Sequence, residues 1–121
     1  MSTLTEGQHA GEFVVSEANG SRSREPATVV TGQNLKAGHV VGTVTASGKL
    51  TEWNPANLDG SETVSGILFD NVDATAADAS GVVFARDAEV QASALQYFDG
   101  ATQGDRDTAA AQLSALGIIV R

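Results

Sequence analysis

The chain has 121 residues, fifteen of them acidic and seven basic, and its formal net charge at pH 7 is -8. This length suffices for one domain with one core of modest size. The acidic balance argues against a nucleic-acid partner, because phosphate binding requires a positive patch and the seven bases are spread along the chain. No run approaches the roughly 18 apolar residues of a membrane span, and no basic-then-apolar leader is present, so we expect no membrane partner. The absence of cysteine excludes disulfides, thiolate metal sites and a cysteine nucleophile.

Residues 1–26 differ in composition from the rest of the chain and predict a flexible N-terminal arm before a β-rich domain over residues 27–121. The stretch Ser21-Arg22-Ser23-Arg24 is interpreted as a solvated hinge. One short island of strand-forming residues interrupts the arm, and it consists of Glu12, Phe13, Val14 and Val15. Two interpretations of this island remain open. It is either an edge strand packed on its own domain or a strand that adds to the sheet edge of a partner.

Beyond the arm, turn residues separate short runs rich in β-branched side chains, which indicates a mostly β fold. About six short strands are expected, over residues 27–31, 39–46, 49–53, 63–69, 81–85 and 89–92. The Ser47-Gly48 turn predicts a hairpin with Val44 and Leu50 on its inner face. Residues 54–60 are predicted to form a loop, and the Asp- and Ala-rich residues 70–80 a linker.

The hydrophobic period changes near the C-terminus. Ala109, Leu113 and Leu116 recur at i, i+4 and i+7, which predicts one face of a short helix. Thr102 or Asp105 can cap its N-terminus. Gly117 suits the left-handed position after a helix, and Ile118-Ile119-Val120 predicts a closing strand.

No set of residues in the sequence forms a recognisable active site. His9 lies in the arm and His39 begins a strand, so a histidine metal site or a Ser-His pair lacks the residues it needs. Asp70, Asp73 and Asp78 are the densest carboxylate group, but they lack the glycine and terminal glutamate of a calcium loop. We expect these aspartates to serve turns and caps, with weak surface calcium binding as the alternative. We therefore predict no catalytic residue, no cofactor and no metal site, and expect that the chain is not an enzyme.

Three aromatic side chains leave a different function open. Trp53 ends a predicted strand, and Tyr97-Phe98 precedes a turn at Asp99-Gly100. If Trp53, Tyr97 and Phe98 form an exposed surface, the chain is a generic β-rich module that binds carbohydrate or a small molecule. The alternative is that these rings close the core, with the Trp53 N–H reaching water.

The order of these elements resembles that of the small head decoration proteins of tailed bacteriophages. The matching segments are Leu35-Lys36-Ala37-Gly38, Gly48-Lys49-Leu50, Trp53-Asn54, Asp59-Gly60, Val64-Ser65-Gly66-Ile67-Leu68, Ala88-Glu89-Val90 and Gly117-Ile118-Ile119-Val120. Residues 16–25 also resemble the junction between arm and domain in one branch of the family. No single motif is specific, and the resemblance depends on the ordered set over most of the predicted domain.

The resemblance implies a β-clip-like domain that sits as homotrimers at threefold and quasi-threefold sites on the exterior of the expanded capsid. There it stabilises the head against the pressure of packed DNA. In the family the arm orders by pairing with the major capsid protein, and here that role falls on residues 12–15. The implied partners are thus the major capsid protein and further copies of the chain. The implied location is the outer surface of the virion, after synthesis in the host cytoplasm. The resemblance does not assign the trimer interface.

Overall fold

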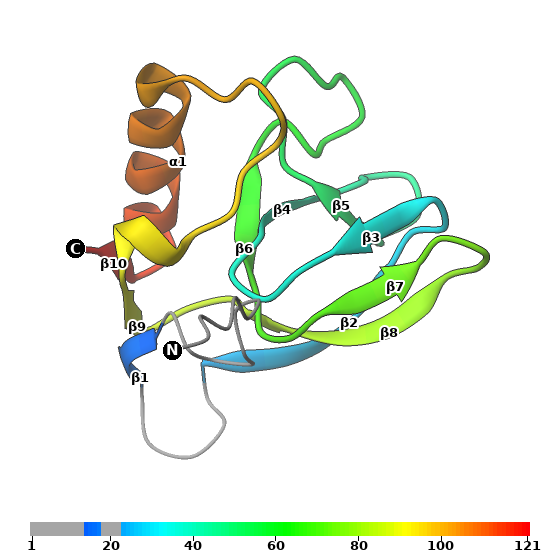
Figure 1. Cartoon of the computed structure of the whole chain (residues 1–121), viewed down its shortest axis with the longest axis horizontal. Coiled ribbons are helices and arrows are strands. Elements are labelled where there is room, and N and C mark those ends of the chain that lie inside the picture. The colour runs from blue at the N-terminus through cyan, green and yellow to red at the C-terminus, as the bar shows by residue number, and fades with distance from the viewer. Residues whose placement is uncertain (1–13, 18–22) are drawn as a thin grey trace, which may run out of the picture.

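The computed structural model describes residues 14–17 and 23–121, and the fold is mostly β with one α-helix near the C-terminus (Figure 1). The strands are β1 (Val14–Glu17), β2 (Arg24–Val29), β3 (Gln33–Leu35), β4 (Val40–Thr43), β5 (Leu50–Glu52), β6 (Val64–Leu68), β7 (Val72–Ala74), β8 (Ala79–Phe84), β9 (Ala88–Val90) and β10 (Ile118–Val120). The helices are a 3-10 turn, η1 (Ala92–Ala94), and α1 (Gln103–Ala115). The predicted fold class, mostly β with a C-terminal helix, is confirmed.

Five strands close into a barrel in the order β2-β5-β4-β6-β8. Its pairs are antiparallel except for β2 and β5, which meet in parallel where Val29 lies opposite Leu50. The β3–β7 ribbon adds its apolar side chains to the barrel core. This core consists of Val29, Leu35, Val41, Leu50, Leu68, Val72, Ala74 and Val83.

A second core lies between the barrel and the remaining elements. In Figure 1, α1, β10, β9 and β1 occupy the left-hand side of the view and the barrel lies to their right. The second core comprises Val40, Trp53, Val64, Ile67 and Phe84 from the barrel and its loops, together with Ala88, Val90, Leu95, Ala109, Leu113 and Ile118. A hydrogen bond crosses the same boundary, because Gln112 Oε1 of α1 accepts from Val64 N of β6 at 2.6 Å. The helix and the barrel are therefore joined by apolar packing and by a polar contact.

The caps of α1 follow the sequence prediction. Thr102 Oγ1 accepts from Asp105 N at 3.1 Å, and Asp105 Oδ2 accepts from Thr102 N at 3.0 Å, which is a reciprocal capping box. Ala109 and Leu113 are buried on the inner face. Gly117 has φ +84°, the left-handed conformation that was expected after the helix. The predicted helix and closing strand are confirmed.

The β4–β5 hairpin is also confirmed, whereas two local predictions are wrong. The expected linker over residues 70–80 contains β7 and the start of β8, and β7 pairs with β3, a strand that the sequence did not predict. Each strand of this ribbon has only three residues, too few for an alternation of apolar and polar side chains to stand out. Ser23, expected in a solvated hinge, is completely buried. Both β1 and the first residues of β2 also lie within residues 1–26, the range assigned to the arm.

One glycine in the loop between β5 and β6 offers a test of this packing. Gly60 has φ +104°, and a Cβ there would collide with the Thr45 side chain and approach Thr43 O at 2.9 Å. We expect Gly60→Ala to lower the free energy of unfolding by about 3 kcal/mol or more. Gly48 also has positive φ but faces open space, so Gly48→Ala should cost only about 1 kcal/mol. Urea unfolding measures both, and equal losses would contradict the assigned clash.

Candidate functional site

Two of the four residues predicted to contact a partner, Val14 and Val15, lie at the edge of a small sheet. Val14 and Val15 begin β1, whereas Glu12 and Phe13 lie outside the described residues. β1 pairs antiparallel with β9, with Val14 opposite Val90. For Val14 and Val15 the structure thus shows the first of the two interpretations, an edge strand on its own domain.

The order of this sheet, β1-β9-β10, leaves β1 and β10 at its two edges. β9 runs antiparallel to β1 and parallel to β10. One face packs on the second core through Ala88, Val90 and Ile118. Among the described residues no strand pairs with the outer side of β1. An edge strand presents backbone N–H and C=O groups along such a side, and these can pair with a strand from another chain.

The register of β1 changes along its length. Val14 packs against the second core, the pairing shifts between Val14 and Ser16, and Val15 has 49% of its surface exposed. A local irregularity of this kind is typical of sheet edges. As a result Val14 anchors the strand to its own domain, and Val15 is exposed to solvent.

Buried contacts fix the chain where it enters the barrel. Ser23 Oγ donates to Asp87 O at 2.7 Å, and Ala85 N donates to Ser23 O at 2.9 Å. Asp87 has φ +52°, uncommon for a residue with a side chain. These bonds attach the start of β2 to the turn between β8 and β9. The start of β2 is therefore held beside the turn that leads into β9, the strand with which β1 pairs.

An apolar hollow next to this junction was missed by sequence reasoning. It is lined by Arg24, Glu25, Pro26, Phe69 and Val82. The guanidinium carbon of Arg24 lies 4.4 Å from the centroid of the Phe69 ring, a cation–π contact. Glu25 forms an ion pair with Arg86. No sequence signal identifies this hollow, because its residues come from three separate segments.

The alternative that Trp53, Tyr97 and Phe98 form an exposed ligand surface is wrong for Trp53. Trp53 is completely buried, and its Nε1 donates to Glu62 O at 2.8 Å instead of to water. Its ring meets that of Phe98 edge to face at 5.8 Å. Tyr97 is half-buried beside Arg106, and burial raises the pKa of the Tyr97 hydroxyl. Trp53 therefore closes the second core and cannot stack on a ligand from solvent.

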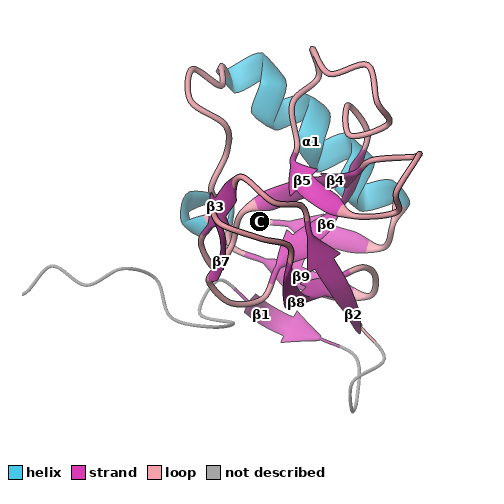
Figure 2. Ribbon diagram, turned by 90° about the vertical axis from the view of Figure 1, so that its right-hand side faces the viewer, coloured by secondary structure: helices cyan, strands magenta, loops and turns pink. Residues whose placement is uncertain are grey.

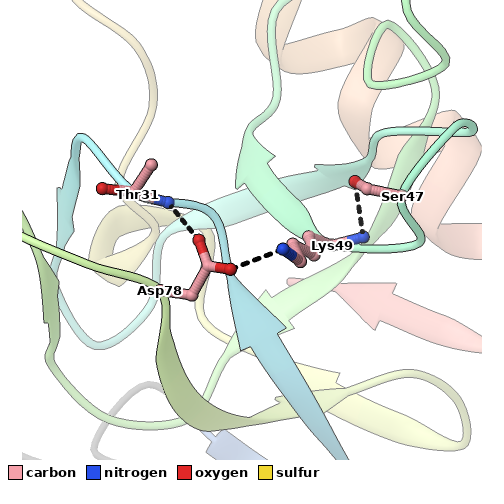
Figure 3. A network of polar contacts seen from close by, with 4 residues as sticks. All are labelled: Thr31, Ser47, Lys49 and Asp78. Atoms are coloured by element: carbon pink, nitrogen blue, oxygen red, sulfur yellow. Dashed lines mark hydrogen bonds and ion pairs between the residues drawn. The ribbon is translucent and has the colours of Figure 1, made fainter.

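The aspartates serve turns and backbone caps, as predicted. Asp73 Oδ1 accepts from Thr75 N at 3.0 Å and from Thr75 Oγ1 at 2.6 Å. Asp78 accepts from Thr31 N at 2.8 Å and from Lys49 Nζ at 2.5 Å (Figure 3). These bonds favour the ionised carboxylates and lower the pKa of both aspartates.

The described part of the chain has neither a cluster of metal-ligating side chains nor a helix that could span a membrane. Across residues 14–17 and 23–121, no three side chains of histidine, cysteine, aspartate or glutamate are grouped so as to hold a metal ion. No helix in those residues has the length and apolar character needed to cross a membrane.

His39 has a structural position. Its Nε2 lies 2.9 Å from Glu52 Oε2 in a largely buried setting. The backbone on either side of it binds Gln96, since Val40 N donates to Gln96 O at 3.0 Å and Gln96 N donates to Gly38 O at 2.9 Å. Burial lowers the pKa of His39, and the opposing effects of Glu52 and Asp99 are smaller. His39 therefore sits where the barrel meets the segment that leads to α1.

Comparison with known families gives a match over nearly the whole chain. The family model described as Bacteriophage lambda head decoration protein D matches residues 3–118. The matched range includes the barrel, α1, β9 and the segment that carries residues 12–15. Among curated proteins no match to the chain was found.

The lowered pKa of His39 predicts how stability depends on pH. In the unfolded chain the histidine titrates near 6.5, so below that pH the unfolded state takes up the proton first. Stability should therefore be full above about pH 6.5 and decrease as the pH falls toward the lowered pKa of the folded state. We expect His39→Gln to reduce this dependence, measured as the change in Tm between about pH 7 and pH 5.

His9→Gln is the matched control, and an equal effect of both variants would contradict the assignment. The titrations of Asp73 and Asp78 do not overlap with that of His39, because their lowered pKa values lie below the ordinary 3.8. The stability that these two carboxylates contribute is present above pH 3.8 and is lost only as the pH falls below it.

Proposed function

The chain belongs to the bacteriophage lambda head decoration protein D family, and from this membership we propose where and how it binds the phage capsid. Family membership establishes a structural role in the phage head. The proposal is that homotrimers bind the outer surface of the expanded capsid at threefold and quasi-threefold positions. There they stabilise the head against the pressure of packed DNA. The protein is made in the host cytoplasm and ends on the virion exterior.

The stabilisation follows from mass action. A ligand that binds one state and not another shifts the equilibrium toward the state that it binds. A trimer that bridges neighbouring capsomers finds its complete contact surface only on the expanded lattice. Each bound trimer therefore lowers the free energy of the expanded shell and resists separation of the capsomers.

The observation that carries the capsid contact is the position of β1 at a sheet edge. β1 pairs with β9 on one side only among the described residues, and the segment with Glu12 and Phe13 precedes it directly. We propose that a strand of the major capsid protein adds along residues 12–15. Backbone hydrogen bonds would then supply affinity, and alternate side chains such as Phe13 and Val15 would supply specificity.

Trimer formation would strengthen this contact. Three arms linked through one trimer bind as a unit, because the first arm to bind raises the effective concentration of the other two. Linked arms of modest individual affinity can thus hold a particle together.

Removal of residues 2–13 tests the contact of the arm. The deletion ends before Val14, because removal of residues 1–17 would also eliminate β1 and its packing on Val90. We expect the shortened chain to keep its Tm but to lose most of its co-sedimentation with expanded capsids of its phage. Circular dichroism measures the folding, and unexpanded capsids are the negative control.

Two results would contradict different parts of the proposal. Unchanged binding of the shortened chain to expanded capsids would show that strand addition along residues 12–15 is wrong. Failure of the full chain to bind expanded capsids would show that the proposed function itself is wrong.

A further inference from the structure

The β1-β9-β10 sheet carries an exposed apolar side chain, Ile119, that lies outside the segment assigned to the arm contact. Among the described residues, the strongly exposed large apolar side chains are Val15, Leu58 and Ile119. Val15 and Ile119 belong to the two edge strands of this one sheet. Single exposed apolar residues are ordinary, but Val15 and Ile119 lie on the two strands that flank β9, so one partner can contact both.

The exposure of Ile119 is set by the alternation of β10. Ile118 is completely buried in the second core and Val120 packs against it, so Ile119, between them, points to the outer face. It has 41% of its surface exposed. In the parallel register Ile119 lies beside Glu89 of β9. Both side chains are therefore on the face of the sheet that the core does not cover.

The charge next to Ile119 is locally balanced. Arg121 Nε donates to Glu89 Oε2 at 2.8 Å, which joins the end of β10 to the middle of β9. The ion pair neutralises the carboxylate of Glu89, which lies beside Ile119, although the chain as a whole carries a net charge of -8. Burying a carboxylate that is paired with a cation costs less free energy than burying an isolated carboxylate. The outer face therefore suits an apolar partner surface rather than a charged one.

The course of the chain indicates which partner reaches this face. The proposed arm contact over residues 12–15 runs into β1, which begins at Val14. Only β9 lies between β1 and β10 in this sheet. A protein that pairs with the arm is thereby brought against the same sheet. Leu58 offers a contrast, because its loop between β5 and β6 is at the top of Figure 1 and β1 is at the lower left. In Figure 2, β1 lies at the bottom of the view and α1 at the top.

We propose that the outer face of β9 and β10, centred on Ile119, is a second contact with the major capsid protein and packs on an apolar patch of that protein. This inference rests on the proposed function, since it takes the capsid as the partner of the arm. The arm would bind by backbone pairing and the sheet face by apolar burial. Capsid affinity would then come from both the arm and the folded domain.

Matched substitutions at two exposed positions test the contact. In the full chain we would compare Ile119→Asp and Ile119→Thr with Leu58→Asp and Leu58→Thr. Each variant is titrated onto expanded capsids that lack decoration protein, and bound protein is measured by co-sedimentation. We expect Ile119→Asp to raise the half-saturating concentration about tenfold or more, and Ile119→Thr to raise it less. Both Leu58 variants should stay within about twofold of the unmodified chain.

Folding and oligomeric state are measured on the same samples. If Ile119→Asp lowers Tm strongly, the inference is decided on Ile119→Thr, which keeps a β-branched side chain suited to a strand. Binding of the folded Ile119 variants equal to that of the unmodified chain would overturn the proposal, as would an equal loss in the Leu58 variants. A change of oligomeric state in the Ile119 variants would assign the face to a contact between copies and would also overturn it. Failure of the unmodified chain to bind would instead count against the proposed function.

Discussion

The burial of Trp53 is the packing constraint on which the rest of the structure depends. Its ring lies in the second core, where residues of the barrel meet residues of α1, β9 and β10, and its N–H is bound by the Glu62 carbonyl. Burying an aromatic side chain of this size removes more apolar surface from water than any other single residue of the chain can. Because this core spans the boundary, the barrel and the sheet that carries the candidate site form one packed unit.

This packing gives the candidate site a rigid base. β9 is held between β1 and β10, its Ala88 and Val90 are buried, and Ser23 ties the start of β2 to the turn before β9. A preorganised surface loses little conformational entropy on binding. A segment that becomes ordered only on binding loses more conformational entropy. A capsid contact that combines an arm with a folded sheet would have both properties, with the sheet setting the position and the arm extending the reach.

The polar side chains that the sequence offers as metal-binding or catalytic candidates stabilise the fold instead. Asp73 and Asp78 accept hydrogen bonds from nearby N–H and O–H groups and from Lys49, and His39 faces Glu52 beside the Gln96 backbone. Each group lies where a turn or a junction between elements needs a polar partner. These contacts agree with the structural role that family membership establishes.

The sequence by itself determined the features that depend on neighbours along the chain. The capping box at Thr102 and Asp105, the left-handed Gly117 and the β4–β5 hairpin all arise from residues a few positions apart, and the ordered motifs identified the family. Only the tertiary structure decided the features that need distant partners. It packed β1 on β9, paired β3 with β7, and buried Trp53 and Ser23. A three-residue strand or a single buried hydroxyl has no periodic pattern of its own, because its stability comes from contacts made only when the chain has folded.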